Sequence, residues 1–234
     1  MKFLKKMFLL FVIIGLIILF YFVFNGYMLY RRAIDTKSIE ARVTELRSKD
    51  FFTTYNELPS YYIDAVVAVE DHRFYTHNGI DYLSILRAVL NNIKAGKPVE
   101  GGSSITQQVA KNLVFNQEKT IYRKIAELFA ARDLERHYSK NEILELYVNN
   151  MYFGNGYYNI HDACYGYYKK VPKELTLYEA TLLAGVPNAP SVYAPTVNMK
   201  LAEQRQSQVL DKMVEYKKIS EEEANKIKSM QQTK

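Results

Sequence analysis

The sequence predicts a mostly helical, all-α domain that follows a single membrane-spanning helix. Three observations lead to this fold class. Apolar residues recur at helical spacing in one segment after another beyond position 30, no segment alternates as a β-strand would, and residues 7–24 form an apolar run interrupted only by Gly15. The length of 234 residues fits one domain with an appendage.

The apolar run near the N-terminus is long enough to cross a bilayer. At a rise of about 1.5 Å per residue, a helix of this length spans a hydrocarbon core about 30 Å thick. A cleavable signal peptide is the alternative. The run exceeds a typical signal-peptide core of roughly 7–15 residues and no A-x-A site follows it, so we expect a retained anchor.

The distribution of charge predicts an orientation and argues against one class of partner. Three lysines lie among the first six residues, whereas Arg31 and Arg32 follow the run, which favours a cytoplasmic N-terminus and an extracellular domain. Without those lysines the net charge of +6 falls to +3, too little to indicate nucleic-acid binding. The single cysteine, Cys164, excludes an internal disulfide framework.

The first half of the folded part is expected to contain a stalk and three helices. Residues 31–55 are charged and form the stalk, and a turn at 56–60 precedes an apolar, helix-compatible segment at 61–70. A polar loop then precedes a helix at 81–95, and a glycine-containing loop precedes a helix at 103–112. Ser103 or Ser104 is the expected N-cap of that last helix.

The second half contains the strongest helical patterns. Amphipathic segments run over 120–137 and 140–152, and Ser139 with Glu142 forms a capping-box pattern at the start of the second segment. A helix over 175–186 ends near two prolines, and a charged helix pair occupies 201–227. We therefore divide the chain into an anchor (1–30), a stalk (31–55) and a folded domain (56–234).

The first polar cluster follows the apolar helix at 61–70. Glu70 and Asp71 place a carboxylate at the end of that helix, where partial desolvation raises the pKa of an acid towards values useful to a general base. A helix-end carboxylate held by Arg73 is the plainer interpretation. His72 and His77 stand five residues apart without a zinc-binding motif, so a histidine-ligated metal is not expected.

Two further clusters are suited to an anion. Residues 101–112 read GGSSITQQVAKN, in which Gly-Gly permits close backbone approach and a helix N-terminus offers N–H and hydroxyl groups. The other cluster contains Lys119, Arg123, Lys124 and Glu127. Arg123 and Glu127 form either an ordinary surface ion pair or a cationic clamp for phosphate beside a carboxylate.

These clusters together resemble one family, the peptidoglycan glycosyltransferases, which occur as the polymerising domain of class A penicillin-binding proteins and as monofunctional enzymes. The matching stretches stand in the family's order: EDHRFYTHNGID (70–81), GGSSITQQVAKN (101–112), RKIAE (123–127), ILELYVNNMYFGNG (143–156) and LTLYEATLLAGVPNAPSVYAP (175–195). Ser104 stands where the family usually has Thr, and Lys119 stands where Arg is common, which weakens a bidentate phosphate contact.

The resemblance implies a lysozyme-like, bilobal domain that polymerises lipid II. The 4-hydroxyl of the acceptor sugar would attack the donor's anomeric carbon, forming a β-1,4 bond with inversion and releasing polyprenyl diphosphate. By the family match, Glu70 is the base and Glu127 the second catalytic carboxylate. The positions expected to bind substrate are Asp71, Phe74, His77, Ser103, Ser104, Gln107, Gln108, Lys111, Lys119 and Arg123.

The implied partners are lipid II, the growing lipid-linked glycan and the membrane, with cell-wall synthesis proteins as further candidates. Residues 113–115 are expected to dip into the membrane interface. The sequence requires no cofactor, although Mg²⁺ or Mn²⁺ often assists diphosphate chemistry. No S-x-x-K or K-T-G motif follows residue 200, so the monofunctional form is expected.

Two alternative functions remain open at this stage. A lysozyme-like hydrolase or lytic transglycosylase also uses a glutamate in an α-rich cleft, but it has no need for cations at Lys111 and Arg123. A membrane-anchored scaffold would use the helices only for packing and partner binding, and it would tolerate loss of the Glu70 carboxylate.

Overall fold

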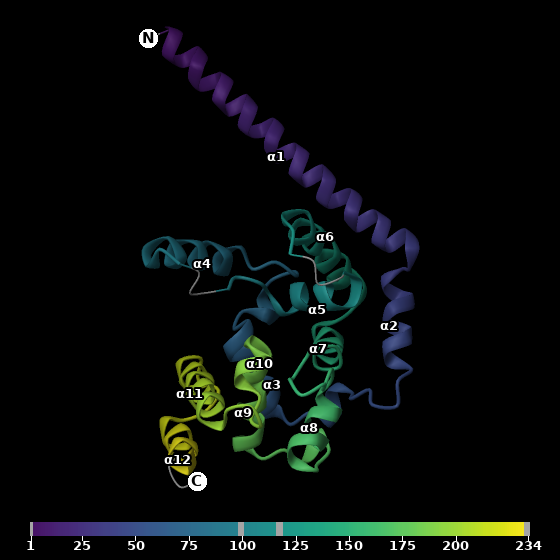
Figure 1. Ribbon diagram of the computed structural model, residues 1–234, viewed down its shortest axis with the longest axis vertical. Helices are drawn as coiled ribbons and strands as arrows, with labels where there is room; N and C mark the ends of the chain where they lie inside the picture. Colours follow the sequence, from purple (N-terminus) through teal and green to yellow (C-terminus); the bar gives the residue numbers. More distant parts are fainter. Residues whose placement is uncertain (1, 98–100, 116–118, 232–234) are drawn as a thin grey trace.

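The computed structural model describes residues 2–97, 101–115 and 119–231. Within these ranges the chain contains α-helices, short 3-10 helices and loops but no β-strand, which confirms the predicted all-α class. Figure 1 shows that the long α1 (Lys2–Thr36) projects away from a body made of two groups of helices. The bilobal architecture expected from the resemblance is therefore present.

In the described part of the chain, the lobe nearer to α1 contains three helices, and the other lobe contains most of the rest. The upper lobe in Figure 1 is formed by α4 (Tyr82–Ala95), α5 (Ile105–Val114) and α6 (Ile121–His137). The lower lobe is formed by α3 (Ser60–Glu70), α7 (Lys140–Val148), α8 (Ile160–Tyr168), α9 (Leu177–Gly185), α10 (Pro190–Tyr193), α11 (Met199–Glu215) and α12 (Glu221–Gln231). Helix α2 (Ile39–Arg47) runs beside both lobes, and α5 contacts α7 where the lobes join.

Helix α3 lies in the core of the lower lobe. Its side chains Tyr62, Ala65 and Val66 are buried, and the helix packs against both α9 and α11. Burial of these side chains holds the helix in one position, because burying a Val, Leu or Ile side chain contributes about 1.5–3 kcal/mol relative to exposure. The last residue of α3, Glu70, is thereby fixed at the boundary between the lobes.

The helix starts follow the capping chemistry that the sequence predicted. Ser104 accepts a hydrogen bond from the backbone N–H of Gln107, and the Gln107 side chain accepts one from the backbone N–H of Ser104. Ser139 and Glu142 form the same reciprocal arrangement at α7. Each such cap satisfies two backbone donors that the first helical turn leaves free.

Several expectations about elements were wrong. Helix α1 continues to Thr36, through the beginning of the expected stalk, and α8 occupies a segment for which no helix was expected. Helix α6 is not a simple amphipathic helix, because it packs against α5 and also against α1. Residues 113–115 do not form an exposed apolar tip: Val114 is buried, and its two neighbours pack partly buried against the core.

The packing of α1 along α6 is close and largely aromatic. The Phe22 ring stacks on Tyr122, and the Tyr30 ring stacks on Phe129. A Cβ atom at Gly26 would lie 2.5 Å from the side chain of Ile125, so only glycine permits this approach of the two helices. The C-terminal part of α1 is therefore packed firmly on the body of the protein.

Candidate active site

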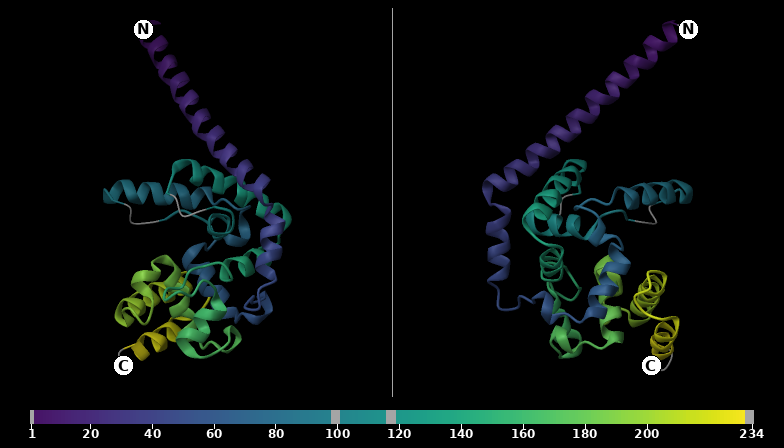
Figure 2. Two further views of the ribbon diagram at one scale, coloured as in Figure 1. Left: turned by 45° about the vertical axis from the view of Figure 1, so that its right-hand side comes forward. Right: turned by 180° about the vertical axis from the view of Figure 1, so that it is seen from behind.

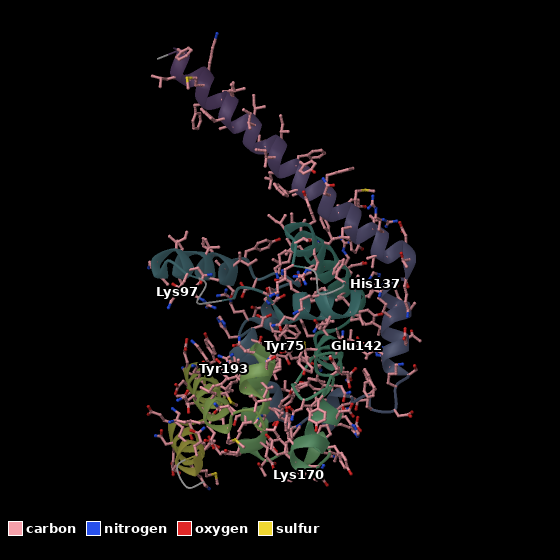
Figure 3. The ribbon with its side chains drawn as sticks, viewed as in Figure 1. Tyr75, Lys97, His137, Glu142, Lys170 and Tyr193 are labelled. Atoms are coloured by element: carbon pink, nitrogen blue, oxygen red, sulfur yellow. The ribbon has the colours of Figure 1, made fainter. Side chains whose placement is uncertain are left out.

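A cavity of about 1150 Å³ lies between the two lobes. The polar face of α4, the start of α5 and part of α6 line one side, and the end of α3 and a stripe on α11 line the other. Figures 1 and 2 show α4 across from α11 in every view. Figure 3 marks Tyr193, which lines the cavity from the lower lobe, and Lys97 at the far end of α4.

Glu70 lies in this cavity and is mostly desolvated. Its side chain is 11% exposed, and its Oε2 accepts a hydrogen bond of 2.7 Å from the Gln108 side chain. Among the described residues, its Oε1 has no hydrogen-bond partner and is buried, and the cation within 4.0 Å is Arg205. Burial raises the pKa of Glu70, and the Gln108 hydrogen bond and the Arg205 charge oppose this rise.

Lys111 lies on α5 and lines the same cavity. Among the described residues, its ammonium group has no hydrogen bond and no ion-pair partner within 4 Å. Burial lowers the pKa of Lys111, and the charge of Glu127 is the largest opposing influence. An unpaired, half-buried ammonium group has a strong electrostatic reason to accept an anion.

Glu127 is held between two cations of its own helix. Its side chain is 1% exposed, with Lys124 at 3.0 Å from one carboxylate oxygen and Arg123 at 3.3 Å from the other. The Lys124 ammonium group also donates a 2.6 Å hydrogen bond to the Ser103 hydroxyl. Lys124 therefore joins the start of α5 to α6, and both Lys124 and Glu127 line the cavity.

Asp71 supports the site from behind. Its carboxylate lies 3.0 Å from the His77 ring nitrogen and accepts a 3.1 Å hydrogen bond from the backbone N–H of Ile105. Phe74, in the same loop, is completely buried beneath the Lys140 ammonium group. These contacts fix the start of α5 next to the end of α3, which places Gln108 within reach of Glu70.

The glycine-rich loop before α5 also has a structural role. A Cβ atom at Gly102 would lie 3.0 Å from the backbone of Ile85, so the loop packs closely against α4. Ser104 donates a short hydrogen bond to the carbonyl of Gly79, and Gln107 is buried in the capping box. Both side chains border the cavity while their polar atoms are used for folding.

The structure brings most of the predicted site residues together. The predicted residues that line the cavity are Glu70, Asp71, Ser103, Ser104, Gln107, Gln108, Lys111 and Glu127. Four others do not line it: Phe74 and His77 lie behind the site, Lys119 is exposed, and Arg123 lines a second, smaller cavity. Direct substrate contact by these four residues stays a prediction without support from the cavity geometry.

Sequence reasoning missed several cations that line the cavity. Arg87 on α4 and Arg205 and Lys212 on α11 were not assigned to a site, and Lys124 was noted without a role. A signal was present in the sequence. Cavity-lining residues of α4 stand at 84, 87, 91, 94 and 95, and those of α11 stand at 205, 208, 212 and 215, which places each set on one face of its helix.

Among the described residues, the one cluster of possible metal ligands is already engaged by protein contacts. Ligand atoms of Asp71, His77 and Asp81 lie within 4.8 Å of one another. Asp71 already accepts from His77 and a backbone N–H, and Asp81 is engaged by Arg73 and Ser84. Because these groups are already paired, we derive no step through a metal.

The arrangement combines a base with a site for a leaving anion. A desolvated carboxylate can accept a proton from a hydroxyl group, and nearby ammonium groups can stabilise negative charge that develops during bond breaking. Charge-assisted contacts of this kind are about twice as strong as neutral hydrogen bonds. The cavity therefore suits a displacement in which a hydroxyl attacks and an anionic group departs.

Comparison with known proteins gives consistent matches. Penicillin-binding protein 1F from Bacillus subtilis (strain 168) is 46% identical over 169 residues, which are 72% of this chain and 24% of that protein. Penicillin-binding protein 1A from Aquifex aeolicus (strain VF5) is 43% identical over 175 residues, or 75% and 24%. This chain therefore spans about a quarter of the length of these relatives.

A solved structure of penicillin-binding protein 1A from Haemophilus influenzae matches 76% of this chain and 17% of its own, with 25% identity and a TM-score of 0.46. The model of the family described as "Transglycosylase" matches residues 37–214, which include Glu70, Lys111 and Glu127. Because this match covers most of the chain, the protein belongs to the transglycosylase family.

Proposed function

We propose that this protein is a peptidoglycan glycosyltransferase that polymerises lipid II into β-1,4-linked glycan strands. The observation that carries the proposal is the placement of the Glu70 carboxylate and the unpaired Lys111 ammonium group in one cavity. Membership of the transglycosylase family supports the same class of reaction. The lipid-linked glycan is the donor, and a new lipid II molecule is the acceptor.

The proposed reaction is a single displacement. As the acceptor 4-hydroxyl attacks the donor's anomeric carbon, its proton passes to Glu70, and the bond between that carbon and the diphosphate oxygen breaks. The electron pair leaves with the polyprenyl diphosphate, whose developing charge is stabilised by Lys111 and Lys124. Attack from the face opposite the departing group inverts the configuration of the anomeric carbon.

We also propose that α1 anchors the protein in the membrane with its N-terminus in the cytoplasm. The described part of α1 is long and apolar enough to cross a bilayer. Its most apolar stretch is not buried against the rest of the protein. The lysines before the span outnumber the arginines after it, which supports this orientation. Both substrates would then meet the enzyme within the plane of the membrane.

A second element supports contact with the bilayer. Helix α4 directs polar residues into the cavity, and its other face exposes apolar side chains, among them Leu83, Leu86, Leu90 and Ile93. A patch of this kind on a soluble surface is uncommon and marks an interaction site. In our proposal this face rests in the membrane surface and opens the cavity towards lipid-linked substrates.

The test uses the purified full chain and labelled lipid II, with glycan strands separated on a gel. We expect Glu70→Gln to lower polymer formation by about 10²–10⁴-fold, the usual contribution of a general base. Glu174→Gln makes the same chemical change at an exposed position outside the cavity and should retain activity. Undiminished polymer from Glu70→Gln would refute the assignment.

Two further arms separate the alternatives. Incubation with finished cell wall tests for a hydrolase or lytic transglycosylase, which would release fragments and make no polymer from lipid II. Repeating the lipid II assay with a chelator tests whether a divalent cation contributes. A protein that is active in none of these assays, while folded, would favour the scaffold interpretation.

A further inference from the structure

A second, smaller cavity lies where the anchor meets the domain. It has a volume of about 310 Å³ and is enclosed by α1, the end of α5 and the start of α6. Leu29, Val114 and Phe115 provide apolar walls, and Arg32 and Arg123 provide two positive charges. No acidic side chain lines it among the described residues.

The position of this cavity along α1 corresponds to the surface of a bilayer. The uncharged stretch of α1 between Lys6 and Arg31 contains 24 residues. At about 1.5 Å per residue it extends about 36 Å, which slightly exceeds a hydrocarbon core of about 30 Å. Arg31 and Arg32 are the first charged residues beyond it, so the cavity lies at the depth of lipid headgroups on the domain side.

Arg32 and Arg123 have guanidinium nitrogens that make no hydrogen bond to a described residue, unlike the nearby Arg42. Arg31 forms an ion pair with Asp35 at 3.1 Å, whereas the Arg32 side chain has no hydrogen bond or ion pair with any described residue. Arg123 is only 13% exposed, and its closest approach to a carboxylate is 3.3 Å, from Nε to Glu127. Its terminal nitrogens donate no hydrogen bond to a described residue.

Nearby Arg42 is engaged differently. Its guanidinium group donates to the backbone carbonyls of Ala33, Lys37 and Leu113, which satisfies it and ties the end of α1 to the end of α5. The wall of the cavity is therefore fixed by protein contacts. The charges that face into the cavity remain available to an external ligand.

We propose that this cavity binds the phosphodiester headgroup of an anionic membrane phospholipid, with Arg32 and Arg123 on the phosphate and Leu29 and Phe115 against the adjoining glycerol and acyl carbons. Guanidinium groups suit phosphate because their planar N–H groups match its oxygens in pairs. Because the described lining residues carry a net positive charge and no acid, the cavity favours an anionic headgroup over a zwitterionic one. The site is separate from the catalytic cavity: its place at headgroup depth rests on the proposed membrane anchor, and it does not depend on the proposed glycosyltransferase activity.

The test measures lipid binding directly, by native mass spectrometry of the full chain released from detergent micelles. Phosphatidylglycerol is titrated against the protein, with phosphatidylcholine of the same acyl chains as the comparison lipid. We expect Arg32→Gln to weaken retention of phosphatidylglycerol about fivefold, the effect of one basic residue near an anionic surface. Arg31→Gln is the matched control, because it removes the same charge from the neighbouring, paired position and should leave retention unchanged.

Each other outcome counts against the proposal. Equal losses in Arg31→Gln and Arg32→Gln would show general charge attraction, and no loss in Arg32→Gln would show that the cavity does not hold the lipid. Equal retention of phosphatidylcholine would show that the cavity does not select an anionic headgroup. Displacement of the bound phosphatidylglycerol by inorganic phosphate would identify a site for a free anion. Its displacement by lipid II would identify a substrate site. Glu70→Gln should retain the phospholipid, so this result is independent of catalysis.

Discussion

At the scale of single residues, Glu70 shows how one side chain combines a cost to stability with a use in chemistry. One of its carboxylate oxygens is buried without a hydrogen bond, and the other is held by Gln108. Burial raises its pKa above the ordinary value of 4.5. A carboxylate with a raised pKa binds a proton more strongly, which is what the proposed role of Glu70 as a general base requires.

This coupling predicts a pH-dependent effect of Glu70→Gln on stability. Because the pKa is higher in the folded chain than in the unfolded chain, Glu70 contributes stability that is fully present below pH 4.5 and is lost as the pH rises through the raised value. Glutamine stays neutral, so the variant should unfold at a higher temperature than the wild type near neutral pH. The difference should disappear below pH 4.5, as measured by circular dichroism. Equal melting temperatures at all pH values would contradict the burial argument.

Arg205 offers a second test at this scale. Its charge lowers the pKa of Glu70 from the facing helix α11, so Arg205→Met should raise that pKa further. Since Glu70 must be ionised to act as a base, the acidic limb of the kcat/KM profile should move to higher pH, and activity should recover at alkaline pH. Arg205→Lys keeps the charge and should restore most of the profile. A uniform loss of activity at every pH would indicate a structural role instead.

Sequence reasoning identified residues whose chemistry is carried by short motifs. Glu70 was noted as a carboxylate at the end of an apolar helix, and the roles of Glu70, Lys111 and Glu127 were assigned because their short motifs resemble those of the glycosyltransferase family. Arg205 was not found, because its place opposite Glu70 depends on how α11 packs against α3, which no local pattern encodes. Phe74 is the reverse case: its motif predicts a cleft residue, tertiary packing buries its side chain, and its contact with substrate stays a prediction.

At the scale of elements, α4 separates two environments within one helix. Its polar side chains line the catalytic cavity, and its apolar side chains are exposed on another face. The helical spacing of its apolar residues was evident from the sequence. The direction of that apolar face was not, because an amphipathic pattern normally indicates a face turned towards the core.

The absence of tryptophan from the chain allows a direct test of the α4 face. Leu86→Trp introduces the only indole at a side chain that is 56% exposed, and in vesicles its fluorescence should be quenched by lipids with brominated acyl chains. Val171→Trp, at an exposed position of the lower lobe, is the matched control and should not be quenched. Equal quenching at both positions, or none at Leu86→Trp, would remove α4 from the membrane surface.

Element boundaries were predictable where side chains cap the helix. Ser104 and Ser139 mark the starts of α5 and α7 through local hydrogen bonds, and both were identified. Helix α8 was missed although Asn159 caps it by the same chemistry, since its tyrosine-rich sequence lacks a strong helical preference. There, burial of Ile160 and Cys164 in the core contributes what local preference does not.

At the scale of the whole molecule, the proposed orientation can be checked with single cysteines. Burial raises the pKa of the native Cys164 thiol and should keep it unreactive. In intact cells, a membrane-impermeant maleimide should label Glu221→Cys in the lower lobe, whereas Phe3→Cys should be labelled only after permeabilisation. The wild-type chain should remain unlabelled. Labelling of Phe3→Cys in intact cells would reverse the orientation.

The close packing of α1 on α6 means that the two helices should move together. Gly26 lets the two helices touch, and α6 carries Glu127 and Lys124. Transmembrane helices tilt when their apolar length exceeds the thickness of the surrounding bilayer. Because α1 packs directly on α6 around Gly26, a tilt of α1 in the membrane would rotate the cavity between the lobes with it. Acyl-chain length in the host membrane would thereby set the angle at which substrates enter, without any change in the chemistry of the site.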